Sequence, residues 1–226
     1  MPTLSRQHQL KDDIIYHIFN RGNRKLKIFH EDGDYLHFKD IIRRYVSKKE
    51  LIIAHYSLMP NHYHLEAGME KPEAMSSIIG GINRAYTHYY HKKYKTSGYL
   101  WQGRFKSKPV EKEEYSIRLG GYIEMNPVRA GLVKSPEEYV YSSARHYILG
   151  EPDDLVTEDP NFQDFGITTE EKRKKYLKHL MENYQDTQNE KALLQEVVGS
   201  KGFKNRLCKN SGRWVPKRQG KPIIRL

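Results

Sequence analysis

Residues 51–68 read LIIAHYSLM-PN-HYHLEAG, two largely apolar segments separated by a Pro-Asn pair. Segments rich in β-branched and aromatic residues on both sides of such a short breaker predict two strands joined as a hairpin. Side chains two positions apart in a strand point to the same side of the sheet. We therefore expect His62 and His64 to face one way and Tyr63 the other, so that both imidazoles could converge on one metal ion.

Further strands and helices alternate around this hairpin. Strands are predicted at residues 13–20 and 104–111, the second of them at an edge or a bulge because Pro109 lacks an N–H. The spacing of apolar residues predicts helices at residues 31–48, 73–95 and 113–125, the last ended by Asn126 and Pro127. This order is typical of an α+β, ferredoxin-like (RRM-like) βαββαβ sheet with one added helix, which could cover the sheet's second face.

The chain changes character after about residue 150. We therefore predict a domain of residues 1–150 and an extension of residues 151–226. Charged amphipathic helices are predicted at residues 168–184 and 188–198. Residues 199–226 contain many lysines and arginines and no acidic residue, which is typical of a tail that becomes ordered on an anionic partner.

The composition points to an anionic partner inside a cell. The 226 residues carry a formal net charge of +11, and nucleic acid is the commonest partner of such a chain. A ribosome-associated or merely soluble basic protein is the alternative. Some of the 17 tyrosines could stack on unpaired bases, although most are expected to pack in the core. The single Cys208, the lack of a membrane-length apolar run and the lack of a secretory signal predict a cytoplasmic protein.

A second chemical group lies in residues 122–126, YIEMN. In a helix, Tyr122 and Asn126 share a face. A phenol is a weak nucleophile unless it is assisted, and a divalent cation that polarises a phosphate supplies part of that assistance. Two imidazoles and one amide oxygen suit Mg²⁺, Mn²⁺ or another first-row ion better than a structural zinc. Taken singly, the histidines and Tyr122 could be structural residues, and Asn126 could be a helix terminus.

Three ordered blocks are similar to a known family. MPNHYHL (59–65), WQGRFK (101–106) and YIEMNPVRAGLV (122–133) resemble the signatures of HUH single-tyrosine transposases, and more narrowly of REP-associated tyrosine transposases. The resemblance covers about residues 10–150. It implies that His62 and His64 bind the metal and that Tyr122 is the nucleophile. It further implies phosphate contacts, or solvated charges, at Arg104, Lys106 and Arg129.

Asn126 departs from the pattern of the related insertion-sequence transposases, which carry a glutamine there as the third metal ligand. Asparagine keeps the carbonyl oxygen on a side chain one methylene shorter. The KRQGKP stretch (217–222) weakly resembles a basic Gly-Pro element that binds a minor groove, with Lys217, Arg218 and Lys221 as candidate DNA contacts. A tail that contacts phosphates without reading sequence is the alternative.

The function implied by the resemblance is that of a transposase. Such an enzyme nicks and joins single-stranded DNA beside a REP-type hairpin through a 5′-phosphotyrosine, with Mg²⁺ or Mn²⁺ as cofactor, in the cytoplasm at the nucleoid. A monomer and a homodimer both stay open. The competing hypothesis is a non-catalytic protein that binds hairpin DNA or RNA. A metal-dependent hydrolase using water is disfavoured by the absence of a His-Glu-x-x-His motif.

Overall fold

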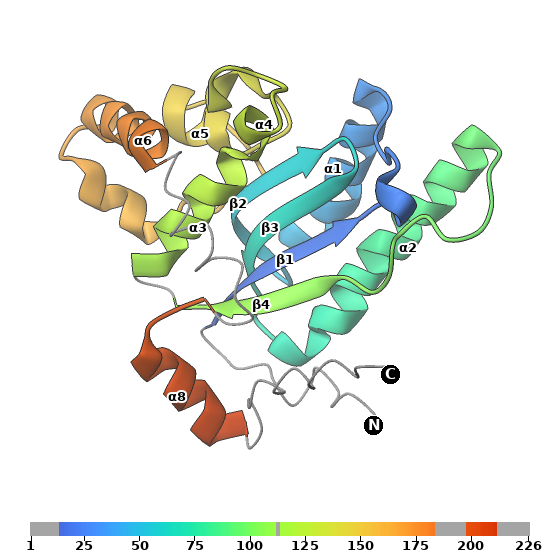
Figure 1. The fold of residues 1–226 in the computed structure, drawn as a ribbon, viewed down its shortest axis with the longest axis horizontal. Helices are drawn as coiled ribbons and strands as arrows, with labels where there is room; N and C mark the ends of the chain where they lie inside the picture. The colour runs from blue at the N-terminus through green and yellow to red at the C-terminus, as the bar shows by residue number, and fades with distance from the viewer. Residues whose placement is uncertain (1–13, 112–113, 184–197, 212–226) are drawn as a thin grey trace, which may run out of the picture.

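The computed structural model describes residues 14–111, 114–183 and 198–211. They form a mixed α/β fold around a four-stranded antiparallel sheet with the strand order β2-β3-β1-β4 (Figure 1). The strands are β1 (Ile15–Arg21), β2 (Ile52–Met59), β3 (His62–Gly68) and β4 (Lys106–Val110). The predicted mixture of helices with a four-stranded sheet is confirmed.

The central hairpin has the predicted position. Met59 at the end of β2 pairs with His62 at the start of β3, so Pro60 and Asn61 form the connection. β1 lies between β3 and β4 and pairs with both. β4 is the edge strand of the sheet, as Pro109 predicted, because a missing N–H is tolerated at an edge, and its outer side carries an isolated bridge between Val110 and Val198.

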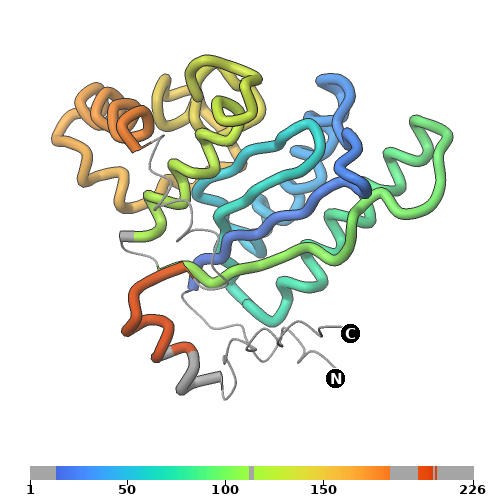
Figure 2. Tube along the Cα trace, viewed as in Figure 1, coloured from blue at the N-terminus to red at the C-terminus, as the bar shows by residue number. Residues whose placement is uncertain are grey.

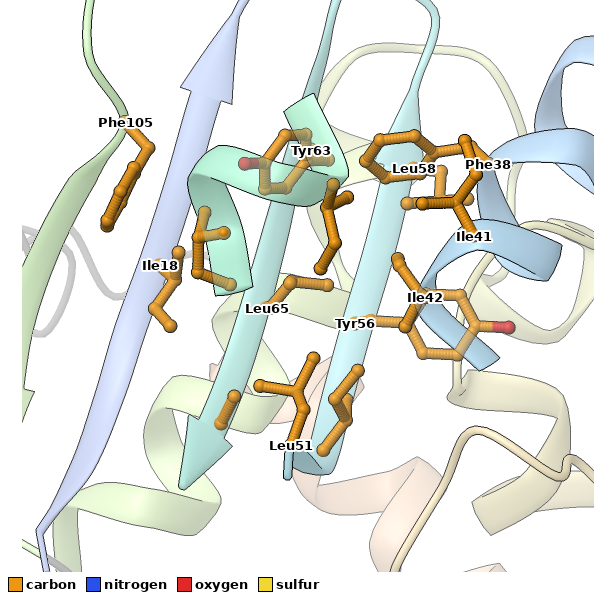
Figure 3. Close-up of a cluster of buried hydrophobic side chains, with 14 of the residues drawn as sticks. Ile18, Phe38, Ile41, Ile42, Leu51, Tyr56, Leu58, Tyr63, Leu65 and Phe105 are labelled. Carbon is orange, nitrogen blue, oxygen red and sulfur yellow. The ribbon is translucent and has the colours of Figure 1, made fainter. Parts of the chain in front are cut away.

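Helices α1 (Asp32–Val46) and α2 (Met75–Tyr94) cover one face of the sheet and enclose the main core (Figure 1). Tyr63 points into this core and donates a hydrogen bond from its hydroxyl to Asn83 Oδ1 over 3.0 Å. Figure 3 shows this core, in which Phe38, Ile41 and Ile42 of α1 lie over the β2 side of the sheet near Tyr56 and Leu58, and Leu65 and Ile18 continue the same buried cluster toward β1. Because these residues face the core, the alternate residues of each strand, including His62 and His64, face the second side of the sheet.

The second face of the sheet is covered by the chain that follows β4. Helix α3 (Glu114–Glu124) approaches it so closely that a Cβ added to Gly120 would lie 2.6 Å from the ring of His55 on β2. Helices α4 (Asn126–Arg129), α5 (Ala144–Leu149) and α6 (Thr169–Asn183) follow. Short 3-10 helices occur at Asn23–Lys25, Pro72–Ala74, Pro136–Glu138 and Pro160–Phe165. The tube in Figure 2 shows α3 between the sheet and α6.

The end of α3 differs in detail from the expectation. Asn126 and Pro127 do stop this helix, but the chain continues as the single turn α4, with the proline in its first turn. Proline is tolerated there because the N–H groups of a first turn have no partner within the helix.

The extension is described in part. α6 matches the predicted helix at residues 168–184, and α8 (Lys201–Ser211) lies within the predicted basic tail. The predicted helix at residues 188–198 falls almost wholly outside the described residues, as do Lys217, Arg218 and Lys221. An apolar cluster joins Met125 to Tyr147 and Leu180, across the predicted boundary at residue 150, and the division into two domains stays a prediction.

Within the described part of the chain, no helix combines the length and the apolar character needed to cross a membrane.

Candidate active site

His62 and His64 lie side by side on the face of β3 that is turned away from the main core. Their ring centroids are 5.0 Å apart and their planes are nearly perpendicular. His64 is buried and His62 is half-buried. Tyr63 between them points into the core, as expected from strand alternation.

The Nδ1 atoms of both histidines are engaged in hydrogen bonds. His62 Nδ1 is bonded to the side-chain oxygen of Asn61, whose own Nδ2 donates to the carbonyl of Lys25. Since that oxygen can only accept, His62 carries its proton on Nδ1 and has its lone pair on Nε2. His64 Nδ1 lies 2.8 Å from Nε2 of His17 on β1.

His17 is the site residue that the sequence did not indicate. It is 1% exposed, its ring stacks on His64 with centroids 5.0 Å apart, and its Nδ1 has no hydrogen-bond partner among the described residues. The β1–β3 register places Phe19 opposite His64 and His17 opposite Glu66, so His17 is a diagonal neighbour of His64. A histidine within the apolar segment IIYHIF was the available signal, but its partner depends on the pairing of strands about 45 residues apart.

The three imidazoles are neutral at neutral pH. Burial, with Lys108 nearby, lowers the pKa of His17 to about 3. Burial, with Arg21 nearby, lowers the pKa of His62 to about 4, and burial holds the pKa of His64 well below its usual range. Metal ligation requires neutral imidazole, so this environment fits a cation site.

Tyr122 lies on α3 directly beside these histidines. Its ring meets those of His64 and His17 edge-on, with centroid distances of 6.0 and 6.1 Å. The guanidinium of Arg129 lies 5.0 Å from the centroid of the Tyr122 ring, and its Nη1 donates to the Tyr122 carbonyl over 3.2 Å. The fold therefore brings the phenol and the guanidinium of residues 122–129 together with two imidazoles from β1 and β3.

Asn126 folds back onto the end of α3. Its Nδ2 donates to the carbonyls of Tyr122 over 2.8 Å and of Ile123 over 3.3 Å, so the amide caps this helix. Oδ1 is the atom through which Asn126 could also hold a cation. Across the described ranges, no three His, Cys, Asp or Glu side chains are placed to hold a metal ion together.

Basic side chains border the histidines on the β4 side. Arg104 and Lys106 are exposed, and Lys106 Nζ lies 6.0 Å from the ring centroid of Phe19. That ring in turn stacks on His64 with centroids 5.6 Å apart. Lys108, which the sequence did not single out, lies 5.5 Å from the same Phe19 ring. An anion at the histidines would thus be surrounded by positive charge on this side.

Comparison with known proteins matches the chain to a family model and to solved structures. The family model described as transposase, IS200-like, matches residues 11–126. A solved structure described as the REP associates tyrosine transposase bound to a REP hairpin is similar in fold, with a TM-score of 0.56 and 18% sequence identity over 70% of this chain and 93% of that chain. No curated protein matches the chain.

Proposed function

The chain belongs to the family of IS200-like transposases, and on this premise we propose that it nicks and joins single-stranded DNA with Tyr122 as the nucleophile. The observation that carries the proposal is the placement of the Tyr122 ring against His64, across the interface between α3 and β3. A phenol is a weak nucleophile that needs assistance, and a cation held by the neighbouring neutral imidazoles would supply it.

In the proposed reaction, the Tyr122 oxygen attacks the scissile phosphorus. A P–O bond to tyrosine forms, the P–O3′ bond breaks, the phenol loses its proton, and the leaving 3′ oxygen gains one. The products are a 5′-phosphotyrosine and a free 3′-OH. Because one phosphoester replaces another, a 3′-OH can reverse the step, and the same site can therefore join strands as well as cut them.

We assign the metal site to Nε2 of His62 and of His64, with Oδ1 of Asn126 as the third ligand. Asn61 accepts the Nδ1 proton of His62, and we assign Nε2 of His17 as the acceptor of the Nδ1 proton of His64, the tautomer that leaves Nε2 of His64 open to a metal. Mg²⁺ or Mn²⁺ bound there would polarise the scissile phosphate as a Lewis acid. Arg129 beside the phenol, and Arg104 and Lys106 near β4, would bind the phosphate backbone.

The proposed substrate is single-stranded DNA next to a hairpin, since the structurally similar transposase was bound to a REP hairpin.

We also assign the sheet to the ferredoxin-like class, because its strand order and the helices after β1 and β3 follow the βαββαβ scheme. Tyr122 and His64 of one chain already lie together, so one copy contains both halves of the site. We expect the enzyme to act in the cytoplasm, where the nucleoid is accessible.

The decisive experiment is gel electrophoresis under denaturing conditions after incubation with labelled hairpin oligonucleotides and Mn²⁺. The wild-type protein should form a covalent protein–DNA band. Tyr122→Phe should abolish the band while DNA binding stays close to that of the wild type. Tyr99→Phe is the matched control, because Tyr99 is 90% exposed and has no place in the site.

The outcomes separate the competing functions. A covalent band that persists in Tyr122→Phe would remove Tyr122 from its role. Metal-dependent nicking without any protein-linked DNA would indicate a hydrolase that uses water. Salt-sensitive binding with neither nicking nor a band would indicate a non-catalytic hairpin-binding protein.

A further inference from the structure

Glu124 is a buried carboxylate on α3, two residues after Tyr122, and it binds three elements at once. Oε1 is bonded to His55 Nδ1 on β2 over 2.8 Å and accepts from the Ser143 hydroxyl, at the start of α5, over 2.6 Å. Oε2 accepts from the Tyr176 hydroxyl on α6 over 2.9 Å. Glu124, His55 and Tyr176 are each 0% exposed. The end of α3 is thus held by the sheet on one side and by α6 on another.

A second buried connection holds the start of α3. The Ser116 hydroxyl donates to Asp159 Oδ2 over 2.7 Å, and the same oxygen lies 3.6 Å from His55 Nε2. Asp159 also caps the 3-10 helix Pro160–Phe165 by accepting from the backbone N–H of Asn161. α3 is therefore bound at two points, and at each point one partner comes from residues 159–180.

A β-bulge presents His55 to this cluster. The β2–β3 register shifts between Ile53 and His55, so that Ile53 pairs with Ala67 and His55 with Glu66. Without the extra residue, Ile53 and His55 would share a face. The bulge leaves Ile53 in the main core and turns His55 toward α3.

Two consecutive glycines let α3 approach both of its neighbours. A Cβ on Gly120 would lie 2.6 Å from the His55 ring, and a Cβ on Gly121 would lie 2.9 Å from Cδ2 of Leu180 on α6. Both distances are shorter than an ordinary Cβ contact, so a side chain at either position would force α3 or its neighbour to shift.

The charges of this cluster are consistent with a fixed arrangement. Burial alone would lower the pKa of His55, but Glu124 and Asp159 outweigh it and raise that pKa to about 10. Hydrogen bonds and the His55 charge outweigh burial at Asp159 and lower its pKa. A cationic His55 between two carboxylates is an ion pair that α3 would have to break in order to move.

We propose that residues 159–180 are part of the active site, because they hold the nucleophile helix in place, with Asp159 and Tyr176 as positioning residues for Tyr122. The inference rests on the proposed function. Tyr122 and Glu124 are about 200° apart around α3. A change in the contacts of Glu124 therefore rotates or shifts the phenol, and a displacement of about 1 Å can cost on the order of 100-fold in rate. These residues lie beyond the 11–126 match to the family, so the extension completes the site.

The test uses the full chain with Tyr176→Phe, which removes one hydroxyl and keeps the buried ring. We expect the single-turnover rate of covalent adduct formation to fall by about 10- to 100-fold, with the Kd for the same oligonucleotide unchanged. Tyr86→Phe is the matched control. It also removes a buried tyrosine hydroxyl, one that donates to the carbonyl of Ile28 over 2.6 Å in the main core on the other face of the sheet. We expect this control to lower the Tm and to leave the rate unchanged.

A second variant keeps the inference testable if Tyr176→Phe does not fold. Gly121→Ala removes no hydrogen-bonding group, but its Cβ would lie 2.9 Å from Leu180 Cδ2, so it should shift α3 against α6 and also slow adduct formation at constant Kd. The inference is overturned if both Tyr176→Phe and Gly121→Ala react at the wild-type rate, or if Tyr86→Phe slows the reaction as much as they do. A wild-type protein that forms no adduct would instead refute the proposed function.

Discussion

Nε2 of His17 on β1 lies 2.8 Å from Nδ1 of His64 on β3, in a contact where both rings are buried. A histidine that binds a metal through one nitrogen commonly bonds an outer partner through the other, which sets its tautomer and its orientation. Asn61 has the same relation to His62. The two candidate ligands thus each have an outer partner, supplied by different parts of the fold.

The first prediction concerns this outer partner. His17→Ala should weaken Mn²⁺ binding by about 10- to 100-fold, as measured by calorimetry without DNA, because His64 loses the acceptor that orients it. His17→Gln keeps a side-chain oxygen that can accept the same proton, and it should retain more affinity. Unchanged Mn²⁺ affinity in His17→Ala would show that His17 only packs against His64.

The second prediction separates the two roles of Asn126. Asn126→Asp keeps a side-chain oxygen but loses the donor to the Tyr122 and Ile123 carbonyls, so it should lower the Tm by the loss of about 1 kcal/mol of capping and still bind Mn²⁺. Asn126→Ala should lower the Tm and also weaken Mn²⁺ binding by at least about tenfold. If the alanine variant binds Mn²⁺ as tightly as the wild type, Asn126 is a cap and not a ligand.

The third prediction is a loss of stability that originates at Glu66 as the pH rises from about 4.5 to 8. Burial raises the pKa of Glu66 to about 8, although His55 and Ser116 oppose the shift. An unfolded glutamate titrates near pH 4.5, so the native state holds a proton that the unfolded state has released between these pH values. The resulting stability is complete below pH 4.5 and is lost as the pH rises through 8. His55, with its pKa near 10, adds a loss of the same sign between pH 6.5 and 10.

Glu66→Gln should therefore flatten this dependence. The free energy of unfolding by urea should exceed that of the wild type at pH 8, and the difference should shrink toward pH 5 with a slope of up to about 1.4 kcal/mol per pH unit. Glu73→Gln, at an exposed position, is the control and should follow the wild-type profile. Parallel profiles for Glu66→Gln and the wild type would contradict a protonated Glu66 in the folded state.

Local patterns in the sequence were sufficient for part of this structure. Alternation in residues 62–65 gave the correct faces for His62, Tyr63 and His64, and Pro109 indicated the edge strand. These predictions succeeded because each depends on the geometry of one strand. The placement of Tyr122 against His64 followed from the resemblance to the family and from the predicted order of elements, because it requires α3 to cover the sheet.

The remainder depends on contacts between distant segments. His17 joins the site only through the β1–β3 register, and His55 reaches Glu124 only because a bulge shifts β2 by one residue. Tyr176 reaches Glu124 only because α6 packs near α3, and the apolar pattern of α6 does not predict which element it packs against. In each case the sequence gives the residue type, but both its burial and its hydrogen-bond partner are set by tertiary packing.

The last prediction tests the basic residues beside the site. Arg104 and Lys106 are exposed, and neither forms an ion pair with another described residue. If each contacts one phosphate, replacement by alanine should reduce the slope of log K against log salt concentration by about 0.7 for a single strand, because one fewer counterion is released on binding. Lys175→Ala is the control, since Lys175 lies on α6 and pairs with Glu171. Fluorescence anisotropy at four salt concentrations would measure the slopes. A slope equal to that of the wild type in Arg104→Ala and Lys106→Ala would identify both as solvated charges, and the positive field at the histidines would then come from Lys108 and Arg129.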